Sequence, residues 1–184
     1  MRTELKGVGC MNTRITLYIA NHTGNARNTL YPHKVEVKGL DDFRRAMAYD
    51  HVCAEYNGCH RSVKDFISAD CIMFDCDNDH SDNSSDWVLP ENVQSAFPGV
   101  GFYFCYSRHH NRAKNGRNPR PKFHIYFAVD PIYDATEYAS LKERVIEGFP
   151  ALHLDTGAKD SARFFFGVNN PQVNYFEGVS HETK

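Results

Sequence analysis

Two aspartates separated by one residue, Asp75 and Asp77, directly follow a short apolar run in the chain. The run, Cys71 to Phe74, is bounded by polar residues and predicts a buried strand. Side chains alternate along a strand, so the two carboxylates should point to the same face. Because neighbouring like charges repel, a cation between the two carboxylates would stabilise the pair, and an all-oxygen ligand set suits Mg2+ or Mn2+. The alternative is a polar strand end that runs into a loop.

Two more candidate residues lie on predicted strands further along the chain. His124 falls in the apolar run from Phe123 to Val129, and Asp155 ends the short run that begins at Leu152. Strands that end together in one sheet can bring such side chains to a single site. Three carboxylates suit a two-metal centre for phosphoryl transfer. A lone histidine in a strand is more often structural, but near phosphates it can donate a hydrogen bond, and a charge if protonated.

Basic residues gather between Arg108 and Lys122, where six of fifteen positions are lysine or arginine. Glycine and proline interrupt the segment, which predicts a loop joining two strands of a long antiparallel hairpin. Phosphate binding is the favoured interpretation, and a solvated surface hairpin is the alternative. The candidate ligands of a triphosphate are Arg108, Lys122, Lys159 and Arg163. The candidate contacts to single-stranded DNA are Arg61, Arg112, Lys114, Arg117 and Arg120.

The remaining elements follow from periodicity and turn residues. Further strands are predicted at Arg14–Ala20, His33–Gly39, Val100–Ser107, Leu152–Asp155, Phe164–Val168 and Val173–Phe176. Helices are predicted at Asp41–Tyr49, Trp87–Phe97 and Asp134–Phe149, with a short one after Ser62. The predicted helix caps are Asp41 or Asp42, Ser62, and Asp134 or Thr136.

Length and composition limit the class of protein. The chain has 184 residues and a formal charge of -2, which predicts one domain spanning residues 1–184. No apolar run approaches the length of a membrane span, and residues 1–10 carry no apolar signal region. Six cysteines without a disulfide-scaffold pattern indicate a reduced, cytoplasmic protein. His51, Cys53, Cys59 and His60 are zinc-ligand types, but their spacing favours ordinary buried thiols.

Three short segments resemble the motifs of a known superfamily. Phe74-Asp75-Cys76-Asp77 resembles the hydrophobic-Asp-x-Asp first motif of the archaeo-eukaryotic primase (AEP) superfamily, the primase-polymerases. Lys122-Phe123-His124 resembles its second motif, small-x-His, although a lysine stands in the small position. Leu154-Asp155 resembles the third motif, a hydrophobic residue followed by aspartate. The segments 57–82 and 155–166 also resemble the small primase-polymerases of phages, plasmids and other mobile elements.

The resemblance implies a fold and a site. The fold is α+β, with an N-terminal α/β lobe and an RRM-like lobe around a central, mostly antiparallel sheet and the active site in the cleft. Asp75, Asp77 and Asp155 are the implied catalytic residues and ligands of two Mg2+ or Mn2+ ions. His124 is the implied contact to the phosphates of an incoming NTP or dNTP. Further nucleotide-binding neighbours, placed mainly by their charge and position, are Ser107, Arg108, Lys122, Lys159 and Arg163.

The implied function is that of a template-dependent DNA primase or polymerase, which adds nucleotides to a 3′ hydroxyl on single-stranded DNA. Relatives often carry a helical accessory domain or a helicase, so one interpretation is a catalytic core excised from a longer protein. A nicking replication initiator is a rival, but its His-x-His metal pair is replaced here by the adjacent His109 and His110. A metal-dependent nuclease is a second rival. A non-catalytic RRM-like module is a third, although three carboxylates would repel its nucleic acid.

Overall fold

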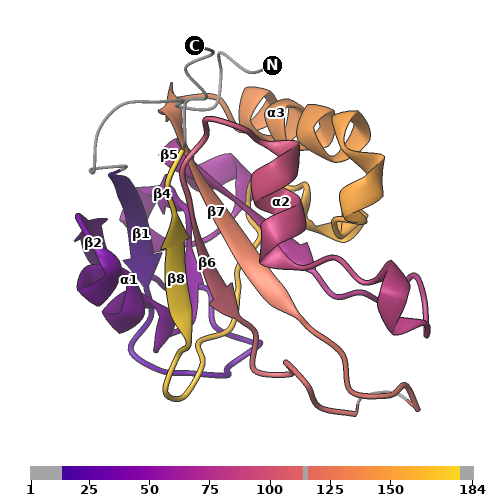
Figure 1. Cartoon of the computed structure of the whole chain (residues 1–184). Helices are drawn as coiled ribbons and strands as arrows, with labels where there is room; N and C mark the ends of the chain where they lie inside the picture. The colour runs from indigo at the N-terminus through magenta and orange to yellow at the C-terminus, as the bar shows by residue number, and fades with distance from the viewer. Residues whose placement is uncertain (1–13, 114–115, 179–184) are drawn as a thin grey trace.

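A five-stranded antiparallel sheet forms the centre of the molecule (Figure 1). The computed structural model describes residues 14–113 and 116–178. The strand order is β4-β5-β7-β6-β8. The strands are β4 (Ala54–Tyr56), β5 (Phe66–Cys76), β6 (Phe102–Tyr106), β7 (Phe123–Ile132) and β8 (Val173–Phe176). All of their pairings are antiparallel.

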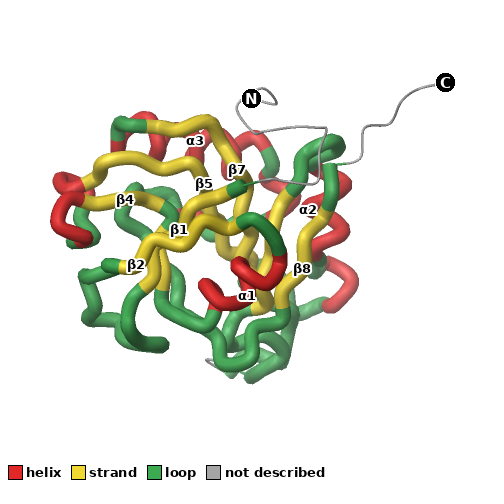
Figure 2. Tube along the Cα trace, turned by 90° about the vertical axis from the view of Figure 1, so that its left-hand side faces the viewer, coloured by secondary structure: helices red, strands yellow, loops and turns green. Residues whose placement is uncertain are grey.

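A smaller sheet and three α-helices cover the two faces of the large sheet (Figure 2). The smaller sheet has the order β2-β1-β3, built from β1 (Ile15–Ile19), β2 (His33–Val37) and β3 (His51–Val52). It packs with helix α1 (Leu40–Met47) on one face. Helices α2 (Pro90–Ala96) and α3 (Ala135–Gly148) lie on the opposite face. None of the helices in these described ranges has both the length and the apolar character needed to cross a membrane.

Two cores result because the central strands are apolar on both faces. In β5, Ile72 and Phe74 pack toward α2 and α3, whereas Cys71 and Met73 pack toward α1 and β1. This alternation follows from the two-residue period of a strand. On the second face the apolar series of β5 continues into Asp75, which is only partly buried. The polar site therefore begins where the apolar packing of that face ends.

Most of the predicted elements are confirmed. The α+β class, the mostly antiparallel sheet, the β6–β7 hairpin and the three helices agree with the structure. The predicted caps Ser62 and Asp134 are also confirmed, since their side chains accept hydrogen bonds from the backbone amides that follow. The division into an α/β lobe and an RRM-like lobe stays a prediction.

Three local predictions are wrong. Leu152–Asp155 is not a strand, because Pro150–Leu152 form a 3-10 turn and His153 adopts a left-handed conformation with φ of 47°. The segment Phe164–Val168 contributes only an isolated bridge between Phe165 and His51. Helix α1 is capped by Gly39 without a side-chain bond. Asp42 instead accepts a hydrogen bond from the backbone of Lys38.

Candidate active site

A cavity of about 270 Å3 opens at the end of β5, where seven of the fourteen predicted site residues meet. Asp75 and His124 face each other directly across the β5–β7 pairing. His124 is in turn the partner of Cys105 on β6, the strand that leads into Ser107 and Arg108. The residues that line the cavity are Asp75, Asp77, Ser107, Arg108, His109, His124, Asp155, Arg163, Phe164, Phe165 and Phe166.

Asp75 is the most deeply placed carboxylate of the site, with 14% of its side chain exposed. Its Oδ1 atom is buried and makes no hydrogen bond within the described residues. Burial, followed by repulsion from the nearby carboxylates of Asp77 and Asp155, raises the pKa of Asp75 to about 8. The raised pKa is what unfavourable desolvation and like-charge repulsion produce together. A cation at this position would relieve both effects.

A backbone hydrogen bond holds Asp155 at the site. Its amide donates a hydrogen bond to the carbonyl oxygen of Asp75 at 2.9 Å, which joins the loop after α3 to the end of β5. The Asp155 carboxylate accepts a hydrogen bond from the amide of Gly157 at 2.9 Å and lies 3.3 Å from the guanidinium of Arg163. The sequence prediction that a strand delivers Asp155 is therefore wrong, but the residue still lines the cavity.

Asp77 is neutralised by a buried lysine. Lys122 Nζ lies 3.1 Å from Asp77 and 3.0 Å from Asp79, and its side chain is only 3% exposed. Asp79 belongs to the loop that follows β5. Lys122 therefore serves as a counter-ion within the protein. It was predicted to bind phosphate, but it does not line the cavity.

The donor set suits a hard divalent cation, although two of the three carboxylates already form ion pairs within the protein. Asp75, Asp77 and Asp155 supply only oxygen, the ligand atom preferred by Mg2+ and Mn2+. Within the described ranges, no three His, Cys, Asp or Glu side chains are arranged to hold a metal ion as they stand. The reason is visible in the ion pairs of Asp77 with Lys122 and of Asp155 with Arg163. The uncompensated Oδ1 of Asp75 is the feature that fits a cation directly.

His124 is held as a neutral imidazole. Burial lowers its pKa to about 3, and the positive charges of Arg163 and Arg108 contribute to the same shift. Its ring stacks on Phe165 with a centroid distance of 4.1 Å. Its Nε2 lies 3.7 Å from Asp75 Oδ1, too far for a hydrogen bond. At neutral pH His124 can therefore offer a hydrogen bond to a ligand, but not a positive charge.

Two arginines bring positive charge to the cavity. Arg163 pairs with Asp155, and Arg108 lies with its guanidinium carbon 3.7 Å from the centre of the Phe166 ring. Ser107 lines the cavity beside Arg108, and its hydroxyl accepts a hydrogen bond from the amide of His109. Of the predicted nucleotide ligands, Ser107, Arg108, His124 and Arg163 thus share one cavity with the three carboxylates.

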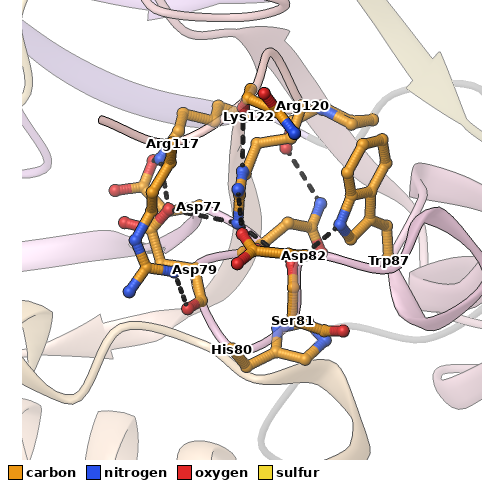
Figure 3. A network of polar contacts seen from close by, with 12 residues as sticks. Asp77, Asp79, His80, Ser81, Asp82, Trp87, Arg117, Arg120 and Lys122 are labelled. Atoms are coloured by element: carbon orange, nitrogen blue, oxygen red, sulfur yellow. Dashed lines mark hydrogen bonds and ion pairs between the residues drawn. The ribbon is translucent and has the colours of Figure 1, made fainter. Parts of the chain in front are cut away.

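The second half of the basic loop is bound to the loop after β5 (Figure 3). Arg120 is 1% exposed, pairs with Asp82 at 2.6 Å and donates to the backbone carbonyls of Asn78 and Ser81. The guanidinium of Arg120 is thus buried among protein acceptors, and its contact with DNA stays a prediction. Arg117 is exposed but donates to the carbonyl of Asp79.

The other predicted cationic contacts lie outside the cavity. Arg61 donates to the carbonyl of Ala162 at 2.7 Å and packs over the ring of Phe164. Lys159 is exposed and pairs with Glu143 at 2.7 Å. Arg112 is exposed on the basic loop. Lys114 lies outside the described residues.

The zinc alternative is not supported by the side-chain contacts. His51 is buried between the carbonyl of Tyr49 and the hydroxyl of Tyr126. The thiol of Cys53 contacts that of Cys71 at 3.4 Å. His60 pairs with Asp65. These three residues therefore have ordinary structural partners. Cys53 is the buried thiol that the spacing argument favoured, whereas Cys59 is exposed.

Sequence reasoning missed the aromatic part of the cavity. Phe164, Phe165 and Phe166 line it, together with His109. The three phenylalanines were interpreted as a core strand because apolar runs usually are. Their position directly after Arg163, within a segment already assigned to the site, is the signal that could have identified them.

Comparison with known proteins gives one structural likeness. No family model matches the chain, and no curated protein matches it. A matching solved structure is the AEP domain of the primase-polymerase of cyanophage S-2L. The two share 13% sequence identity and a TM-score of 0.45, over 92% of this chain and 83% of the cyanophage chain.

Proposed function

We propose that this chain is a metal-dependent nucleotidyltransferase that extends a DNA strand on a single-stranded template, as primase-polymerases do. The proposal is carried by the site and not by the likeness to the cyanophage domain. Its main support is that Asp75, Asp77 and Asp155 line one cavity with His124, Arg108 and Arg163. Carboxylates, which bind divalent cations, and cationic side chains, which bind phosphates, are both needed to bind a nucleoside triphosphate.

The residues divide the work of nucleotidyl transfer between them. Asp75, Asp77 and Asp155 would hold Mg2+ or Mn2+, which when bound activates the attacking 3′ oxygen and stabilises the charge on the leaving pyrophosphate. Arg163 and Arg108 bind phosphate oxygens, Arg163 after leaving Asp155. Neutral His124 donates a hydrogen bond to the triphosphate. The bond from the 3′ oxygen to the α-phosphorus forms as the bond to the bridging oxygen breaks, so no protein nucleophile is required.

The cavity disfavours the nicking initiator as an alternative. That chemistry needs a tyrosine beside the metal, and no tyrosine lines the cavity formed by the described residues. His110 is also engaged, because it accepts a hydrogen bond from the amide of Lys122 and packs against Tyr106. A metal-dependent nuclease would use the same carboxylates, so it is the alternative that the experiment must separate.

The test is an extension assay on single-stranded DNA, with and without an annealed primer, using labelled NTPs or dNTPs and Mg2+ or Mn2+. We expect primer extension by the parent protein and its loss in Asp75→Asn and Asp155→Asn. Asp70→Asn is the matched control, because Asp70 lies on the same strand but binds Thr16 away from the cavity. Template shortening without synthesis would identify a nuclease and refute the proposal.

A further inference from the structure

Two half-buried phenyl rings form an apolar surface in the same cavity as the carboxylates. Phe164 and Phe166 line the cavity, and their ring centres are 5.0 Å apart. Phe165 between them is turned inward, 3% exposed, and stacks on His124. Binding of metal ions and phosphates alone does not require partly exposed aromatic rings. Apolar surface left in water is unfavourable, so the exposure of these rings calls for a further ligand group.

A planar guanidinium group already packs over each of the two rings. The guanidinium of Arg108 lies over Phe166, with 3.7 Å from its central carbon to the ring centre. The guanidinium of Arg61 lies over Phe164 at 4.6 Å. Within the described ranges Arg108 has no acidic partner, so the ring is its principal contact. Arg108 and Phe166 both line the cavity, so a flat group that enters it meets this stacked pair.

The backbone holds the two rings in place although the segment is not a strand. The amide of Phe165 donates to the carbonyl oxygen of His51, and the amide of His51 donates to the carbonyl oxygen of Phe165, both at 2.9 Å. The amide of Gly167 donates to the buried carboxylate of Asp50 at 2.8 Å. Gly167 passes so close to the end of α1 that a Cβ atom would lie 2.6 Å from the carbonyl oxygen of Ala48. The rings are therefore preorganised.

We propose that the ring of Phe166 forms a stacking surface for the base of the bound nucleotide, with the base taking the place of the Arg108 guanidinium. The ring of Phe164 stands at 79° to that of Phe166 and supports it edge to face. The inference rests on the proposed function. A nucleotide combines polyanionic phosphates with an aromatic plane, and this cavity combines arginines with aromatic rings. Base–aromatic stacking tolerates any sequence and grows with the area of the base. The released Arg108 is then available to the phosphates.

The proposal predicts a preference for purines in the absence of a template. The test is isothermal titration of the whole chain, in Mg2+, with dATP, dCTP and inorganic tripolyphosphate. We expect Phe166→Leu to weaken dATP binding about tenfold, dCTP binding less, and tripolyphosphate binding not at all. Phe164→Leu should act in the same direction. Phe176→Leu is the matched control, because Phe176 is half-buried against Phe102 and does not line the cavity.

The outcomes separate this inference from the proposed function. If the parent protein extends primers and binds dATP, but neither leucine variant weakens dATP, the stacking surface is refuted and the proposed function stands. Equal weakening of dATP and tripolyphosphate would refute it also, since that result indicates general damage to the cavity. If the parent protein binds neither dATP nor dCTP, the proposed function falls, and the stacking surface falls with it.

Discussion

The backbone amide of Asp155 donates a hydrogen bond to the backbone carbonyl oxygen of Asp75 at 2.9 Å. These residues are eighty positions apart in the chain, and this contact joins a loop to the end of the central strand β5. The contact depends on no side chain, so either carboxylate can be changed without removing the bond itself. Substitutions at the two aspartates therefore test the chemistry of the site separately from its assembly.

The amide variant of Asp75 should gain stability as it loses cation binding. Because the pKa of Asp75 is raised from 3.8 to about 8, folding at pH 7 requires this carboxylate to take up a proton that the unfolded chain does not hold, and an asparagine avoids that cost. We expect Asp75→Asn to raise the midpoint of thermal unfolding in a metal-free buffer and to abolish any rise caused by Mn2+. The measurement is a thermal unfolding scan with and without Mn2+. An Asn variant that is less stable than the parent, yet still stabilised by Mn2+, would contradict this view of Asp75.

Two lysines predicted from sequence to bind nucleotide should behave differently when changed. Lys122→Met leaves Asp77 and Asp79 without their buried counter-ion and should lower the free energy of unfolding by about 3 kcal/mol. Lys159→Met is the matched control, because its ion pair with Glu143 is exposed and screened by solvent, so little change is expected. Urea unfolding at pH 7 provides both values, and equal effects of the two variants would count against the burial argument.

Arg112 and Arg120 belong to the same loop but should differ in their effect on DNA binding. Arg112 is exposed, so Arg112→Ala should weaken single-stranded DNA binding and reduce the salt dependence of the affinity by about one ion. Arg120→Met should instead destabilise the fold, because Arg120 ties the loop to Asp82 and to two backbone carbonyls. Fluorescence anisotropy at several salt concentrations, beside urea unfolding, separates the two. A stable Arg120→Met protein with a reduced salt slope would refute the structural role.

Lys142 should make stability rise with pH. Burial lowers the pKa of Lys142 from 10.5 to about 8 in the folded chain, with opposing contributions from Cys53 and Asp160 and a reinforcing one from Arg163. Between those two pH values the unfolded chain holds a proton that the folded chain lacks, so this group adds stability as pH increases and costs most below pH 8.

The difference between the parent and Lys142→Met isolates this contribution from that of the thiols and phenols that titrate in the same range. We expect the free energy of unfolding of the parent to increase relative to that of the variant as pH is raised from 8 to 10. Denaturant unfolding across this range gives the difference directly. A difference that is independent of pH would show that Lys142 has an ordinary pKa in the fold.

The parts of the fold that follow from local pattern were predictable. The β5 run ends in Asp75 and Asp77, and the hairpin around the basic loop has clear turn residues, so both were found from sequence. Asp134 was found because a capping residue bonds to amides adjacent in sequence. These features depend on a few neighbouring residues, which is the information that a single sequence contains.

The parts that depend on long-range contacts were not predictable from one sequence. Leu154 and Asp155 look like a strand end, but the left-handed His153 and the bond to Asp75 place them as a loop. Arg120 and Lys122 look like free cations, but the acids that bury them lie some forty residues earlier. A sequence shows which charges exist, but not which of them neutralise each other.

The measurement that tests the central claim most directly is Mn2+ binding followed by electron paramagnetic resonance, in which the signal of free Mn2+ disappears on binding. We expect the parent protein to bind Mn2+ and dATP to tighten this binding. Asp75→Asn and Asp155→Asn should lose the binding, while Asp70→Asn should keep it. Unchanged Mn2+ binding in the Asp75 and Asp155 variants, or no binding by the parent even with dATP, would contradict the claim that these carboxylates form a cation site.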